Sequence, residues 1–148
     1  MSTNLTAHAS IEIHADIEHV WAALVDPEMI SKYLFGTRTT TSWEPGTPIT
    51  FSGEWEGKKY EDKGIIKAFD EYRRLQYTYW SSMSGIEDRP ENYYLVTFQL
   101  AVKNGATVLS VTQENVKDEA TRAHSESNWL LVLGTIKQLL EHSGEKVG

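Results

Sequence analysis

The sequence predicts an α+β domain in which one curved antiparallel sheet packs against a long C-terminal helix. Apolar residues recur at helical spacing only after the first strand and again near the end of the chain. Between these segments, stretches of alternating apolar and polar residues are separated by glycine, proline and asparagine turns, as in strands joined by hairpins. The expected order is one strand, two helices, six strands and a long helix, with about seven strands in the sheet.

The N-terminal segment predicts one strand followed by two short helices. Residues 5–15 alternate between apolar and polar side chains, which is the period of a strand with one solvent-facing side. Asp16 is a suitable N-cap for a helix that stops at Pro27. Asp26 and Pro27 then form a second start signal, so another short helix is expected to run to Gly36.

The middle of the chain predicts six strands. Gly46 follows a proline and suits a type II turn, because only glycine takes the positive φ angle cheaply. Asn104-Gly105 is a strong signal for a two-residue hairpin. The only long irregular stretch, Ser81 to Asn92, is a place where a lid or gate could lie. The strands are expected over residues 39–43, 49–56, 60–69, 75–80, 94–100 and 108–114.

Residues 125–144 predict a long amphipathic helix. Trp129, Leu133, Ile136 and Leu140 recur at helical spacing and form an apolar stripe. The strands that must cover this stripe are unusually aromatic. A curved sheet closed by one helix can leave a hollow, and aromatic side chains commonly line ligand pockets. The sequence therefore predicts a pocket between the sheet and this helix.

The composition indicates one domain spanning residues 1–148, long enough to bury a core without crosslinks. Cysteine is absent, which excludes disulfides, thiolate metal sites and cysteine nucleophiles. The start of the chain lacks a basic region followed by an apolar run, and no apolar run reaches the roughly 20 residues of a membrane helix. The net charge of −7, with scattered basic residues, argues against a nucleic-acid partner. We expect a cytoplasmic protein without membrane insertion.

Signals for catalysis or metal binding are weak. There is no glycine-rich phosphate loop, Gly-x-Ser-x-Gly elbow or His-Glu-x-x-His sequence. Glu12, His14 and Asp16 alternate, but the polar side of a strand and a helix cap explain them better than a metal site. His124 is either a proton carrier at the cavity mouth or a solvent-facing side chain. We assign no catalytic residue, metal site or cofactor.

Four carboxylates crowd the predicted hairpin around residue 57. Their placement on either side of a turn predicts an exposed acidic tip, although a functional pair of carboxylates is the alternative. These residues are Glu54, Glu56, Glu61 and Asp62.

Three groups of residues carry a resemblance to a known family. They are Ile11–Trp21 followed by Asp26-Pro27, the hairpin Val96–Leu100 to Thr107–Val111, and Trp129–Leu133 with Leu139–Glu141. Together they resemble the homologues of the activator of the 90-kDa heat-shock chaperone's ATPase. That family belongs to the helix-grip superfamily, which also contains the birch-pollen allergen, steroidogenic-acute-regulatory-related lipid-transfer domains and aromatase/cyclase proteins. The segments span nearly the whole domain, and their order makes the resemblance specific.

The resemblance implies a helix-grip fold with a cavity between the sheet and the closing helix. Aromatic residues on an inner strand face are more often plain core than ligand contacts. Three or more phenols, however, cannot all be buried without hydrogen-bond partners, so water or a polar ligand group is a natural partner. Gln113 supports the same interpretation, unless it lies at a frayed strand end. Strand parity gives the expected ligand-binding residues as Phe51, Trp55, Tyr77, Tyr79, Tyr94, Phe98, Gln113 and Trp129.

Two departures from the family pattern bear on the entrance of that cavity. The family usually has a glycine before the tryptophan of the closing helix, where this chain has Asn128. A tryptophan that commonly ends the second helix is replaced by the segment Tyr33–Phe35. Both changes are expected to alter the size and polarity of the entrance, and hence the class of ligand.

Three functions are compatible with these features. The leading hypothesis is a non-enzymatic binding or carrier domain for a small hydrophobic or aromatic molecule. The resemblance also implies a chaperone-regulating, stress-response interaction protein, although activating members carry an additional domain that this chain is expected to lack. The third is a cyclase or hydratase type of pocket enzyme that relies on His124 or a cavity tyrosine. A monomer or a homodimer is compatible with all three.

Overall fold

A computed structural model describes residues 5–34, 36–82 and 85–145, without the side chains of Trp55 and of residues 142–145. The elements confirm the predicted α+β class and order: one strand, two helices, six strands and a long helix. They are β1 (Leu5–Ile13), α1 (Ile17–Val25), α2 (Pro27–Tyr33), β2 (Arg38–Thr41), β3 (Pro48–Trp55), β4 (Lys58–Asp70), β5 (Arg74–Tyr79), a 3-10 turn η1 (Pro90–Asn92), β6 (Tyr94–Lys103), β7 (Ala106–Val116) and α3 (Glu119–Glu145).

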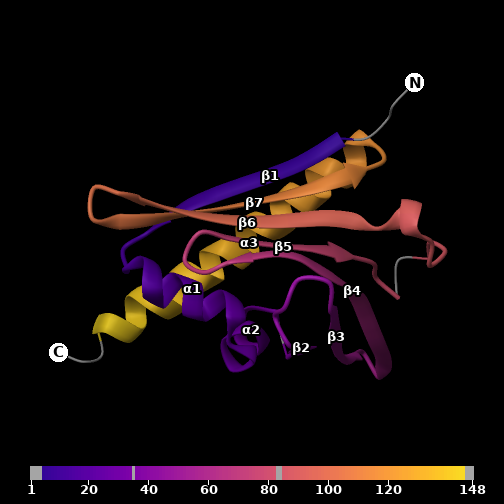
Figure 1. The fold of residues 1–148 in the computed structure, drawn as a ribbon, viewed down its shortest axis with the longest axis horizontal. Coiled ribbons are helices and arrows are strands. Elements are labelled where there is room, and N and C mark those ends of the chain that lie inside the picture. The colour runs from indigo at the N-terminus through magenta and orange to yellow at the C-terminus, as the bar shows by residue number, and fades with distance from the viewer. Residues whose placement is uncertain (1–4, 35, 83–84, 146–148) are drawn as a thin grey trace.

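The described strands form one seven-stranded sheet in the order β1-β7-β6-β5-β4-β3-β2. Every neighbouring pair is antiparallel, and β1 closes against β7 with Ala9 opposite Val111. The sheet therefore brings the first and last strands together at one edge and leaves β2 at the other. Figure 1 shows α3 crossing behind the sheet. β1 and β7 lie at one edge of the sheet in this view, and β3 and β4 lie at the opposite edge.

Glycine-containing turns fix the register of the hairpins. Asn104 and Gly105 both have positive φ angles, 50° and 82°, and join Lys103 to its pairing partner Ala106. This is the two-residue hairpin that the sequence predicts. Gly46, at φ 90°, takes the positive angle expected after Pro45.

The long helix begins earlier than predicted, at Glu119 instead of residue 125. The side chain of Asp118 accepts a hydrogen bond from the backbone N–H of Thr121 at 2.8 Å, and its carbonyl accepts one from Arg122 at 3.0 Å. Asp118 therefore acts as the N-cap, and the polar first turns were missed because they carry no apolar stripe.

The core lies between α3, the inner face of the sheet and α1. Its side chains include Ile13, Val20, Leu109, Leu133 and Ile136, which are all completely buried. α3 packs mainly along β1, with smaller contacts to β7, α1 and α2. Ile49, Ile66 and Leu75 on β3, β4 and β5 are buried in this core. Because the helix follows the β1 edge, the inner face farther along these strands lines an open space instead.

Within the described ranges, no helix is both long and apolar enough to cross a membrane.

A candidate ligand cavity between α3 and strands β3 to β5

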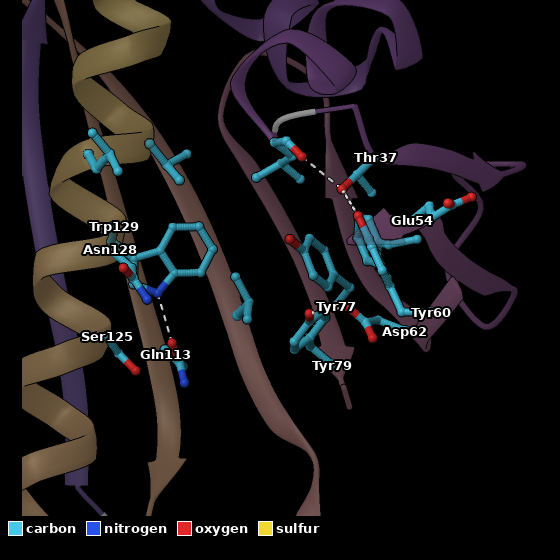
Figure 2. A pocket seen from close by; sticks show the side chains of 15 residues that line it. Thr37, Glu54, Tyr60, Asp62, Tyr77, Tyr79, Gln113, Ser125, Asn128 and Trp129 are labelled. Carbon is cyan, nitrogen blue, oxygen red and sulfur yellow. Dashed lines mark hydrogen bonds between the residues drawn. The ribbon is translucent and has the colours of Figure 1, made fainter. Parts of the chain in front are cut away.

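A cavity of about 630 Å³ lies where α3 diverges from the far half of the sheet. Figure 2 shows α3 on one side of this space and the tyrosines of β4 and β5 on the other. Most of the lining is apolar or aromatic, with a smaller number of polar groups. The lining residues are Leu34, Thr37, Phe51, Glu54, Tyr60, Asp62, Tyr77, Tyr79, Val96, Gln113, Ser125, Asn128, Trp129, Leu131 and Val132.

The helical wall is one face of α3. Asn128 and Trp129 lie three and four residues after Ser125, and Val132 follows them by four and three, so these side chains share one face of the helix. The indole N–H of Trp129 donates a hydrogen bond to Oε1 of Gln113 at 2.8 Å. Gln113 is buried and β7 continues past it to Val116, so the glutamine is not at a frayed strand end. This hydrogen bond fixes the position of the indole ring in the cavity wall.

Aromatic rings in tilted and edge-on contact form the floor on the sheet. Phe51 contacts Tyr77 at 5.6 Å and Tyr79 at 5.7 Å between ring centroids. Tyr77 also lies 6.3 Å from Phe98, which makes an edge contact with Trp129 at 5.6 Å. Such contacts stabilise pairs of rings beyond the burial of their area. The floor is therefore continuous from β3 across the sheet to α3.

The predicted exposed acidic tip is wrong for one of its four carboxylates, that of Asp62. Its side chain is 7% exposed and lines the cavity, whereas Glu54, Glu56 and Glu61 are exposed as expected. The reason is strand parity, because every second residue of β4 faces inward and Asp62 shares the side of Ile66. A carboxylate on that side must be hydrogen-bonded to be tolerated.

Three donors satisfy the Asp62 carboxylate. The phenol of Tyr79 donates to Oδ2 at 2.6 Å. The backbone N–H and the hydroxyl of Ser82 donate to Oδ1 at 2.9 and 3.3 Å. Burial, followed by the charge of Asp62 and this hydrogen bond, raises the pKa of Tyr79 well above its usual value. Tyr79 is therefore a neutral phenol that donates its proton to a buried carboxylate.

Tyr77 has a different environment although it lies on the same strand and face. Its side chain is 7% exposed and lines the cavity, and burial raises the pKa of its phenol. Within the described parts of the chain, its hydroxyl has no hydrogen-bond partner, unlike that of Tyr79. The hydroxyl of Tyr77 can therefore donate to, or accept from, a molecule in the cavity.

A third phenol, that of Tyr60, lies near the segment between α2 and β2. The hydroxyl of Thr37 donates to the carbonyl of Leu34 at 2.8 Å, which uses its single proton. The phenol of Tyr60 must therefore donate to the Thr37 hydroxyl, at 2.6 Å. Figure 2 shows the two hydrogen bonds meeting at the hydroxyl of Thr37. They tie the segment after α2 to β4 at the edge of the cavity.

The cavity opens to solvent between α3 and the β3–β4 hairpin. Glu54, Asn128 and Leu131 line it and are themselves exposed, Leu131 by 58%. Asn128, where the resemblance leads us to expect a glycine, therefore lies at the entrance. Leu34, in the segment where the resemblance leads us to expect a tryptophan, also lines the cavity, whereas Phe35 lies outside the described residues.

The predicted ligand-binding residues fall into three groups. Those that line the cavity are Phe51, Tyr77, Tyr79, Gln113 and Trp129. Phe98 and Tyr94 are not lining residues: Phe98 is buried behind Trp129 and Tyr77, and Tyr94 is partly buried against the core. The side chain of Trp55 lies outside the described residues.

Some lining residues could have been found from the sequence. Tyr60 and Asp62 have the parity of Ile66 on β4, and Ser125, Asn128 and Val132 share the helical face of Trp129. Thr37 carries no such signal, because it lies between α2 and β2 and is positioned by tertiary packing.

Other predicted candidates lie elsewhere. His124 is exposed, contacts Asn128 at 3.2 Å and does not line the cavity. Asp16 caps α1 by accepting a hydrogen bond from the backbone of His19 at 3.0 Å. The described residues of the 81–92 loop do not line the cavity, and Ser82 instead holds Asp62 in place.

Solved structures resemble this chain over almost its whole length. The solution structure of ChR145 from Cytophaga hutchinsonii is 42% identical, with a TM-score of 0.86 over 98% of this chain and 99% of that chain. The Aha1 dimer from Colwellia psychrerythraea is 17% identical, with a TM-score of 0.72 over 93% of this chain and 96% of that one. Ara h 8.0201 is 14% identical, with a TM-score of 0.74 over 94% and 99%. The last two matches show the helix-grip fold alone.

A curated relative is the "Steroid (22S)-hydroxylase" of Brachypodium distachyon, 26% identical over 93 residues. This alignment covers 58% of the chain but spans only 18% of that protein. A family model described as "Activator of Hsp90 ATPase homolog 1-like protein" matches residues 14–141. With this match over most of its length, the chain belongs to the family of activator of Hsp90 ATPase homolog 1-like proteins.

Proposed function

We propose that this protein is a non-enzymatic binding or carrier domain for a small hydrophobic or aromatic molecule that bears a polar group. The observation that carries the proposal is the cavity of about 630 Å³ between α3 and β3 to β5. Ligand sites in proteins typically occupy about 300 to 1,000 Å³ and combine apolar walls with a few polar groups. The ring floor of Phe51, Tyr77 and Tyr79 and the free hydroxyl of Tyr77 fit that description.

Binding is favoured over a reaction by the state of the polar groups. The phenols of Tyr77 and Tyr79 keep their protons at neutral pH, because burial raises the pKa of both. Asp62 is held by Tyr79 and Ser82. Phenols in this state suit the anchoring of a ligand better than the transfer of protons, which requires a pKa near the working pH.

Native mass spectrometry of freshly purified protein tests the proposal, with a variant that blocks the cavity entrance. Asn128→Trp places an indole at an exposed lining position, and Ser127→Trp places the same group next to it on an exposed position that does not line the cavity. We expect a small molecule to accompany the unaltered protein and Ser127→Trp, and to be absent from Asn128→Trp. Equal retention of a molecule by both variants would contradict binding in this cavity.

The family match favours a second candidate, a chaperone-regulating role. Leu130 and Leu131 are exposed by 54% and 58% on α3 and offer an apolar contact to a protein partner. The test is a measurement of chaperone ATPase turnover with the purified chain. Replacing both leucines by serine should abolish any stimulation if this surface makes the contact.

A further inference from the structure

The charges that line the cavity have one sign. Asp62 lies buried in its wall and Glu54 lies at its mouth, and within the described residues no lysine, arginine or histidine contributes to the lining. The nearest base along β4, Lys63, points the other way and pairs with Asp88 at 2.6 Å. Within the described ranges, no salt bridge neutralises Asp62. The cavity therefore presents a negative potential to a bound molecule.

Asp62 also has room for a further donor. An ionised carboxylate accepts about four hydrogen bonds, and the described residues supply three. Oδ1 accepts two of them from Ser82, whereas Oδ2 accepts one from Tyr79. Among the described residues, the free acceptor position is therefore on Oδ2, which accepts the hydrogen bond from Tyr79 in the cavity wall.

The hydroxyl of Tyr77 is a second, independent sign of a polar ligand group. It lies on a side chain that is 7% exposed and lines the cavity, and no described group bonds to it. Since Thr39 Oγ1, and not this hydroxyl, is the buried oxygen without a partner among the described residues, the Tyr77 hydroxyl is accessible from the cavity and can bond to a ligand atom there. The faces of Phe51 and Trp129 attract cations in addition.

We propose that the cavity selects aromatic or apolar molecules whose polar end is a cationic amine or a neutral hydrogen-bond donor, and that it rejects carboxylates. A carboxylate would meet the charge of Asp62 in a poorly solvated site, where like charges repel strongly. An ammonium or hydroxyl group would donate to the free position on Oδ2 and bond to Tyr77. This selection depends on the binding function proposed above.

Three probes with one ring system test the selection: 2-naphthylmethylamine, 2-naphthylmethanol and 2-naphthoic acid. Titration at pH 7, followed by calorimetry, should rank the amine first and the alcohol second. The acid should bind at least about tenfold more weakly than the alcohol. Binding of the acid as tightly as the amine would overturn the selection and leave the binding function in place. No saturable binding of any probe would overturn both.

Charge-neutralising variants test which carboxylate causes the preference for the amine over the acid. Asp62→Asn should reduce the ratio of amine to acid affinity by about tenfold, because the amide has the same shape without the charge. Glu54→Gln, at an exposed lining position, should reduce the ratio by a smaller factor and keeps the test valid if Asp62→Asn does not fold. Glu56→Gln is the control, since Glu56 is exposed on the same hairpin outside the lining. A Glu56→Gln effect as large as that of either lining variant would refute the assignment.

Discussion

Tyr77 and Tyr79 are two residues apart on one strand face, yet their hydroxyls have opposite roles. The hydroxyl of Tyr79 donates to Asp62 at 2.6 Å, while that of Tyr77 has no partner within the described residues. A hydrogen bond to a charged group contributes more to stability than a bond between neutral groups. Tyr79 therefore stabilises the buried carboxylate, and Tyr77 is available to a ligand.

Removing each hydroxyl should separate these roles. We expect Tyr79→Phe to lower the free energy of unfolding by about 1.5 to 3 kcal/mol, because Asp62 loses a donor. Tyr77→Phe should change it by less than about 1 kcal/mol, because no hydrogen bond is lost, while weakening the binding of the amine probe. Urea denaturation measures the free energy of unfolding, and calorimetry measures the affinity for the amine probe. Equal losses of stability in the two variants would contradict the different roles.

At the scale of elements, the close approach of β4 and β5 shapes the tyrosine face. A Cβ built on Gly64 would overlap the backbone carbonyl of Thr78. The hydroxyl of Thr78 also accepts a hydrogen bond from the backbone N–H of Ile65 at 2.9 Å, and the pairing of the two strands shifts register after Ile66. Glycine at 64 is therefore required for β5 to lie where Tyr77 and Tyr79 face the cavity.

A pair of glycine substitutions tests this requirement. Gly64→Ala should lower the free energy of unfolding by about 3 kcal/mol or more, because backbone must move to admit the methyl group. Gly134→Ala, in the interior of α3 where an added Cβ meets nothing within 4 Å, should raise it by about 0.5 to 1 kcal/mol. Thermal and urea denaturation of both variants measure the difference. A Gly64→Ala protein as stable as the parent would show that β5 does not approach β4 this closely.

For the whole molecule, three buried phenols make stability sensitive to alkaline pH. Burial raises the pKa of Tyr33, Tyr77 and Tyr79. Tyr33 lies on α2, where its phenol donates a hydrogen bond to the carbonyl of Ala23 at 2.9 Å. In the unfolded chain these phenols ionise near pH 10, whereas in the folded protein they keep their protons to higher pH.

The free energy of unfolding should therefore be constant with respect to these groups below about pH 10 and fall above it, because the unfolded chain then binds fewer protons. Urea denaturation from pH 7 to 11.5 measures the decrease. Phenolate absorbance should show the three tyrosines ionising together with unfolding. Tyr33→Phe should make the decrease shallower, and early ionisation of all phenols in the folded state would disprove the explanation.

Much of the fold could be predicted because its signals are local. The alternation of residues 5–13, the N-cap at Asp16 and the Asn104-Gly105 turn each depend on a few neighbouring residues. Parity likewise places Phe51, Tyr77 and Tyr79 on the inner face of their strands. Local signals failed where polar residues continue an element, as in the first turns of α3 after Asp118.

By itself, the sequence determined the order of the elements, the sheet and the aromatic character of its inner face, since backbone propensity and periodicity act over short distances. The tertiary structure alone decided that α3 follows β1 and leaves space over β3 to β5. It also decided that Asp62 is buried with Tyr79 and Ser82 while Phe98 lies behind the wall. These outcomes depend on contacts between residues distant in the chain, which no local pattern records.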